Sequence, residues 1–316
     1  MKRIVLLVVG LLTALAVTAA PASSAPKGAA ASNLCNGWEA AGTASFSSIG
    51  SLTSVASTAR GADAITKEPA LNETYEALPD SARSKGSKSF RATVPVWFHV
   101  ISAGGTGNVS PAAIDEQMTV LNLSYGGFYG GAKTGFQFKL VGVDRTDNAA
   151  WFNARAGGID ERDMKQALRQ GGPETLNLYS SVAGGYLGYA YLPGLPDPRQ
   201  YLDGIVFHWE SMVGTSTRFA GRYDRGFTLV HEAGHWLDLE HTFYGACNAK
   251  GDFVDDTPAE GTPTSGCPLG KDTCLREPGL DPIHNYMDYS YDSCYTEFTL
   301  GQASRQQDAW LYFRAP

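Results

Sequence analysis

Residues 231–241 read HEAGHWLDLEH, a stretch in which three histidines fall close together. His231 and His235 are four residues apart, so on a helix their imidazoles lie on one face, where both can reach one zinc ion at about 2.0–2.1 Å. Apolar residues at helical spacing predict this helix over 227–237. The stretch therefore predicts a zinc-binding helix.

A catalytic zinc takes three protein ligands and keeps one position open for water, so the helix alone is one ligand short. His241, six residues beyond His235, is the natural third ligand. To bring it back, the chain must leave the helix through a sharp turn at Asp238, a position that favours left-handed backbone angles. Glu232 is then the expected general base, which takes the proton of a zinc-activated water and passes it to the leaving amine. This chemistry is peptide hydrolysis without a covalent intermediate.

Residues 231–241 resemble the long HExxHxxGxxH zinc signature of metzincin metalloproteases, with Asp238 in place of the usual glycine. Residues 285–289, NYMDY, resemble the Met-turn that lies under the zinc in that clan. The combination resembles the pappalysin-like, or ulilysin-like, branch, over most of residues 94–306. The resemblance implies that Met287 is a structural floor of the metal site, and that Tyr289 approaches the zinc and supports the developing oxyanion. The alternative for Tyr289 is a packed core tyrosine.

The expected fold is α/β (α+β), a metzincin-type zincin with a mixed five-stranded sheet, a backing helix, an active-site helix and a loop-rich C-terminal subdomain. Ser110-Pro111 is an N-cap with proline at the first helical position, and it predicts the backing helix to about residue 125. The sequence beyond residue 239 is rich in Gly, Pro and Asp and predicts loops. Strands are expected at 94–101, 136–143, 175–182, 186–192 and 202–209, and a short polar helix at 160–169.

The N-terminus has the pattern of an export signal. Lys2 and Arg3 precede an apolar run that fades into alanines, which predicts a cleaved signal peptide over residues 1–25. The alternative is a membrane anchor, but the run is about 14 residues long against the roughly 20 that a spanning helix needs. Residues 26–90 are rich in Ala, Ser and Gly and are expected to form a pro-segment, with the catalytic domain at 91–316. We therefore expect a secreted, extracellular enzyme made as a latent zymogen.

Five cysteines in an exported chain predict two disulfides and one spare thiol. The resemblance favours Cys247 with Cys274 and Cys267 with Cys294, although spacing alone allows three pairings. The spare Cys35 precedes the catalytic region, and as a thiolate it could coordinate the zinc and give latency. Its flanking residues differ from the better-known cysteine-switch motifs, so a plain unpaired thiol is the alternative.

Calcium is a second metal to consider. Asp252, Asp255, Asp256 and Glu260 supply hard oxygen ligands, and the resembled family holds calcium in this region. The alternative is a solvated acidic loop.

Charge and length limit the partners. Lys and Arg number 25 against 32 Asp and Glu, a net charge of −7 without a basic cluster, which argues against nucleic acid and anionic membranes. We expect a monomer acting on proteins or peptides. Two other functions are considered: a secreted zinc-binding protein without proteolytic activity, and a zinc amidase acting on cell-wall peptides. The carboxylate of Glu232 argues against the first, and Met287 with Tyr289 argues against the second.

Overall fold

The computed structural model describes residues 68–69, 71, 76–83, 89–248 and 251–316, all within the compact unit Thr53–Pro316. The expected signal peptide, most of the expected pro-segment and Cys35 lie outside the described residues. Among the residues that are described, no helix is long and apolar enough to cross a membrane.

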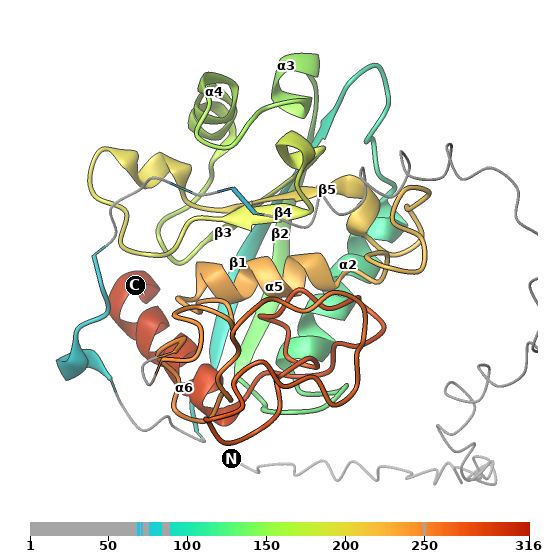
Figure 1. The fold of residues 1–316 in the computed structure, drawn as a ribbon. Helices are drawn as coiled ribbons and strands as arrows, with labels where there is room; N and C mark the ends of the chain where they lie inside the picture. The colour runs from blue at the N-terminus through green and yellow to red at the C-terminus, as the bar shows by residue number, and fades with distance from the viewer. Residues whose placement is uncertain (1–67, 70, 72–75, 84–88, 249–250) are drawn as a thin grey trace, which may run out of the picture. The chain divides into compact units, whose positions relative to one another are not determined.

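One five-stranded sheet forms the centre of the fold (Figure 1), in the order β2-β1-β3-β5-β4. Neighbouring strands run parallel except for β4, which pairs antiparallel with β5 at the edge. The predicted mixed sheet is therefore confirmed, with β2 longer and β4 shorter than predicted. The strands are β1 (Ala92–Ser102), β2 (Phe136–Asp147), β3 (Leu176–Ser181), β4 (Gly188–Ala190) and β5 (Ile205–His208).

Side chains of β1 point alternately to the two faces of the sheet, and each face carries its own layer of the core. Val96 and Phe98 belong to a buried cluster that includes side chains of α2 (Pro111–Tyr125) and α5 (Phe227–Trp236). Ile101 faces the other way, into a cluster with side chains of α3 (Ala149–Phe152) and α4 (Ile159–Leu168). The two pairs of helices thus cover opposite faces of the sheet, as Figure 1 shows. Short 3-10 turns lie at Asp80–Ala82, Ala183–Gly185, Arg199–Leu202 and Trp209–Ser211.

Helix α4 carries a charged pair into the core. Glu161 and Lys165 have fully buried side chains, and Lys165 Nζ lies 2.9 Å from Glu161 Oε1. The same ammonium donates to the carbonyl of Leu202 at 2.6 Å. Each charge therefore depends on the other for its compensation, because neither reaches water.

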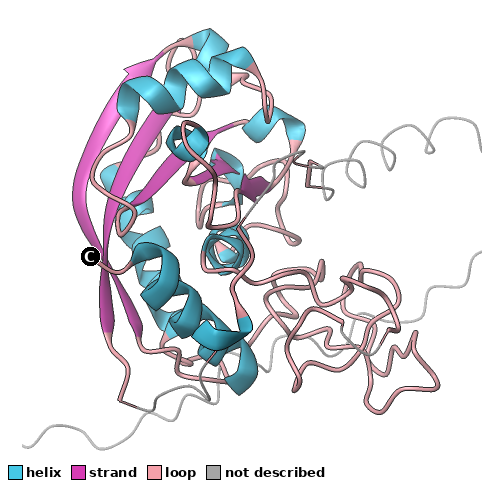
Figure 2. Cartoon of the chain, turned by 90° about the vertical axis from the view of Figure 1, so that its left-hand side faces the viewer, coloured by secondary structure: helices cyan, strands magenta, loops and turns pink. Residues whose placement is uncertain are grey.

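The C-terminal part is rich in loops, as predicted. Within 237–248 and 251–299, the part of this stretch that the structure describes, there is neither a helix nor a strand longer than an isolated bridge (Figure 2). The loops are followed by a helix that the sequence analysis did not predict, α6 (Leu300–Ala309), which continues as a π-helical turn, Trp310–Arg314. Thr299 and Gln302 form a capping box at its start, a local signal that the sequence contains.

Candidate metal centre

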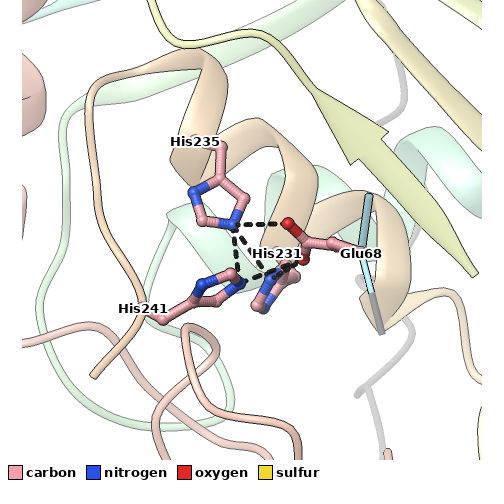
Figure 3. A group of neighbouring side chains, drawn as sticks. All are labelled: Glu68, His231, His235 and His241. Atoms are coloured by element: carbon pink, nitrogen blue, oxygen red, sulfur yellow. Dashed lines mark hydrogen bonds and ion pairs between the residues drawn. The ribbon is translucent and has the colours of Figure 1, made fainter. Parts of the chain in front are cut away.

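Helix α5 places His231 and His235 on one face, and the chain then returns His241 to the same point (Figure 3). The helix ends at Trp236, and Asp238 adopts the left-handed angle φ 71°. Leu239 N donates to Gly234 O and Asp238 N donates to His235 O, both at 2.9 Å, which is the bonding of a Schellman turn. The sharp turn therefore falls where the spacing of the histidines requires it.

The three Nε2 atoms converge at distances suited to one metal ion. His235 Nε2 lies 3.2 Å from His231 Nε2 and 3.1 Å from His241 Nε2. Two nitrogens about 2.0–2.1 Å from a tetrahedral ion would be about 3.3 Å apart. The donor set and its spacing fit zinc.

Carbonyl groups orient two of these rings. His231 Nδ1 lies 2.5 Å from the carbonyl oxygen of Tyr286, and His235 Nδ1 lies 2.6 Å from that of Leu239. A carbonyl only accepts, so Nδ1 carries the hydrogen and Nε2 is directed to the point where the three rings meet, where it could bind a metal ion. Burial lowers the pKa of His241 to about 4, which keeps the third ring neutral as well.

Met287 packs directly beneath α5. Its side chain is fully buried, and a Cβ added at Gly234 would lie 2.3 Å from Met287 Sδ. Only glycine at this position lets the helix and the turn around Met287 approach so closely. Since Tyr286 precedes Met287, this packing also positions the carbonyl that orients His231.

Glu232 is buried beside the three histidines with one oxygen free of hydrogen bonds among the described residues, Oε2. A Cβ added at Gly188 on β4 would lie 2.6 Å from Glu232 Oε1, so the edge strand passes directly over this carboxylate. Burial and the nearby carboxylate of Glu68 raise the pKa of Glu232 well above its usual value. Glu232 is therefore a buried carboxyl group with a raised pKa and one unpaired oxygen, next to the three histidines.

Tyr289 lies at the same site. Its ring centroid is 4.8 Å from that of His241 and 5.8 Å from that of His231, and the side chain is half-buried. Burial and the carboxylates of Glu68 and Glu232 raise the pKa of its phenol, so the hydroxyl keeps its proton. The ring therefore stands where a phenol could donate to a bound substrate.

Glu68 is a site residue that the sequence did not reveal. Its Oε1 lies 2.7 Å from His231 Nε2 and 3.1 Å from His241 Nε2, and its Oε2 lies 3.4 Å from His235 Nε2 (Figure 3). Glu68 precedes His231 by 163 residues, within a stretch of weak pattern, and no local signal in the sequence distinguishes it.

Comparisons with known proteins agree with this geometry. Residues 180–310 match the family model of peptidase family M43, described as pregnancy-associated plasma protein-A. An extracellular metalloprotease of Arthroderma benhamiae is 43% identical over 279 residues, which cover 85% of this chain and 90% of that protein. The chain belongs to the pappalysin family. An extracellular metalloprotease of Pyricularia oryzae is 47% identical over 71% of this pappalysin and 76% of that protein.

Solved structures give the same result for the fold. A structure of mirolysin in complex with a compound has a TM-score of 0.63 and 28% identity, covering 70% of this pappalysin and 92% of that chain. A promirolysin mutant of Tannerella forsythia has a TM-score of 0.62 and 26% identity, covering 73% of this chain and 83% of that one. The protein is a metallopeptidase with the metzincin fold, and its family implies a catalytic metal.

Two disulfides brace the loops of this pappalysin near the site. They join Cys247 to Cys274 and Cys267 to Cys294, the pairing that the resemblance implied. His284 lies close to the second bridge, with Nδ1 2.6 Å from the carbonyl oxygen of Cys294. Cys267, His284 and Cys294 lie close together, but both cysteines are in the disulfide, so this group offers no thiolate to a metal.

The residues expected to bind calcium line one hollow, which includes Asp252, Asp255 and Asp256. Asp252 is buried, Asp255 is exposed, and Asp256 Oδ2 accepts from the backbone of Gly301 at 2.9 Å. Their carboxylates do not converge on one point among the described residues. Glu260 is engaged elsewhere, 2.7 Å from the ammonium of Lys271. Calcium at this hollow stays a prediction.

A pocket adjoins the metal centre on the side of Phe227 and Tyr295, and Asp292 lies in its lining. Asp292 is buried, its Oδ2 accepts from the backbone of Arg225 at 2.7 Å, and its Oδ1 has no hydrogen-bond partner among the described residues. A buried carboxylate oxygen without a partner favours a cationic group that enters the pocket. Burial raises the pKa of Asp292 to about 7.

Proposed function

We propose that this pappalysin is a secreted zinc endopeptidase, made as a latent zymogen, that hydrolyses peptide bonds in proteins and peptides. The observation that carries the proposal is the convergence of three Nε2 atoms beside a buried, partly unpaired carboxylate, Glu232. Residues 1–25 would be a signal peptide, 26–90 a pro-segment and 91–316 the catalytic domain. The relatives that are named extracellular metalloproteases support secretion.

His231, His235 and His241 would hold the zinc. Zinc, when bound, supplies Lewis acidity that polarises the scissile carbonyl and lowers the pKa of a water molecule. The carbonyls of Tyr286 and Leu239 support this role, because they hold two of the rings with Nε2 directed inward. Without these bonds the rings could rotate, and metal affinity would fall.

Glu232 would accept the proton of the attacking water and deliver it to the leaving nitrogen. Its free oxygen and the absence of a side chain at Gly188 leave this carboxyl group able to approach the substrate. Tyr289 would donate a hydrogen bond to the oxyanion that forms on the scissile carbonyl. Met287 would act only as the floor under α5, since its sulfur packs against Gly234.

Strand β4 would align the substrate. Among the described strands it pairs with β5 along one side only, and it lies at the edge of the sheet. An extended peptide could add there through main-chain hydrogen bonds, next to the carboxylate of Glu232. Because main-chain hydrogen bonds do not depend on the side chains, this arrangement would hold peptides of differing sequence.

The test is cleavage of a mixed-sequence peptide library by the processed protein, with and without a zinc chelator. Glu232→Gln should abolish cleavage while the bound zinc, measured by elemental analysis, stays stoichiometric. Glu116→Gln, the same change at an exposed position of α2, is the control and should cleave normally. Zinc binding without cleavage by the wild type would instead support a binding protein, and cleavage restricted to cell-wall peptides would support an amidase.

A further inference from the structure

The carboxylate of Glu68 occupies the point where the three metal ligands meet. The Nδ1 atoms of His231 and His235 face the carbonyl oxygens of Tyr286 and Leu239, so both rings direct Nε2 at this point. A carboxylate oxygen repels a bare Nε2 lone pair unless a proton or a metal ion lies between the two atoms. One metal ion bound by all four groups removes this repulsion.

Contacts elsewhere hold the segment that carries Glu68. Leu71 packs against the buried cluster on the α4 side of the sheet, and Leu78 is buried. Glu76 N donates to Gly194 O at 2.9 Å, and Glu76 Oε1 accepts from Tyr312 at 2.7 Å. Glu68 is therefore one contact of a docked segment, and the anchors raise its effective concentration at the metal site.

The direction of the segment shows how it blocks the site. Glu68 lines the same pocket as Gly188, and Glu76 pairs with Gly194, so the segment runs in the same sense as β4. The group that it places at the histidine Nε2 atoms is a side-chain carboxylate and not the carbonyl of a peptide bond. The segment thus occupies the site as a ligand and not as a substrate.

We propose that Glu68 is the fourth ligand of the catalytic metal in the proenzyme, where its carboxylate takes the position of the catalytic water. This inference rests on the proposed zinc peptidase with a pro-segment. Hydrolysis of a peptide bond near residue 90 would release the segment together with its anchors, and a water molecule would then take the place of the Glu68 carboxylate. The role is the one that the sequence suggested for Cys35, which lies outside the described residues.

The test measures coordination directly. Full-length protein that carries Glu232→Gln, so that the pro-segment stays attached, is loaded with Co²⁺ and its visible absorption spectrum is recorded. Glu68→Gln should change the spectrum toward that of the processed protein. Asp80→Asn, which removes an exposed carboxylate from the same segment without touching an anchor, and Cys35→Ala should leave it unchanged. A spectrum that Glu68→Gln leaves unaltered, or a thiolate charge-transfer band that Cys35→Ala removes, would overturn the proposal.

Latency provides a second readout. In the full-length chain with Glu232 intact, Glu68→Gln should raise peptide cleavage before processing by about 10²-fold, because the tethered ligand is lost. After processing, the wild type and the Glu68→Gln variant are the same molecule and should have equal activity. An inactive processed enzyme would refute the proposed peptidase, whereas the Co²⁺ spectra would still report on Glu68. An unchanged latency of the variant would count against the switch.

Discussion

Gly234→Ala tests the packing of α5 on the turn beneath it. The added methyl carbon would lie 2.3 Å from Met287 Sδ, 3.2 Å from Met287 Cε and 3.5 Å from a methyl group of Leu239. Carbon atoms in favourable contact are about 3.5–4.0 Å apart, so the first two contacts are repulsive. Met287 is fully buried and cannot turn into solvent to relieve them.

Two opposing terms decide the size of the effect. Alanine in place of glycine inside a helix stabilises by about 1 kcal/mol, whereas a methyl group forced into a packed core costs about 1–3 kcal/mol. The variant should therefore be destabilised by about 1 kcal/mol, which lowers Tm by about 2–4 °C in a domain of this size. In a Met287→Ala background the clash is absent, and the same substitution should stabilise the protein by about 1 kcal/mol.

Urea unfolding of the four proteins measures this coupling. All four should carry Glu232→Gln to prevent self-digestion and should be compared without metal, so that ligand binding does not shift the transition. Met287→Ala alone should cost about 2–5 kcal/mol. Non-additivity of about 2 kcal/mol is expected, and effects of Gly234→Ala that agree between the two backgrounds within about 0.5 kcal/mol would refute the packing argument.

Three further predictions concern other parts of the fold. Gly188→Ala should push Glu232 from its position and lower kcat/KM by about 10²-fold with zinc content unchanged; an active variant would contradict the close approach. Lys165→Met should lower the free energy of unfolding by about 3–5 kcal/mol, because it leaves the buried Glu161 without its partner. A clearly smaller loss, measured by chemical denaturation, would contradict this prediction. The unpaired carboxylate oxygen of Asp292 predicts a preference for Arg or Lys next to the scissile bond in a peptide library, and Asp292→Asn should reduce it. In the wild type this preference should weaken as pH falls below about 7, since Asp292 then becomes protonated and neutral. A preference that does not change with pH would show that Asp292 is not the group that binds the basic side chain.

Local patterns predicted the elements that carry the metal ligands. The helix at 227–237 was predicted from the spacing of apolar residues and is observed as Phe227–Trp236. This prediction was possible because the helical period of 3.6 residues involves only residues that are close together in the sequence. The turn at Asp238 followed from the need to return His241, and its φ of 71° agrees. The disulfide pairing came from the family resemblance and not from spacing, which leaves three pairings open.

Helix α6 shows where local patterns mislead. Its inward face carries the buried amides Gln302, Gln306 and Gln307, so apolar periodicity is weak there. Gln302 Nε2 donates to Asn285 Oδ1 at 3.0 Å and Gln307 Nε2 donates to Thr134 O at 2.9 Å. Partners distant in the sequence bind Gln302 and Gln307, whereas the side-chain amide of Gln306 has no partner among the described residues. Hydrophobic spacing cannot anticipate such partners.

The sequence by itself determined which side chains could bind the metal, because the i, i+4 spacing of His231 and His235 and the turn before His241 are properties of adjacent residues. Only the tertiary structure decided what surrounds them. Gly188 above Glu232 and Glu68 among the histidines come from segments far apart along the chain. Such contacts depend on how the sheet, the helices and the N-terminal segment pack, and no short-range pattern encodes that packing.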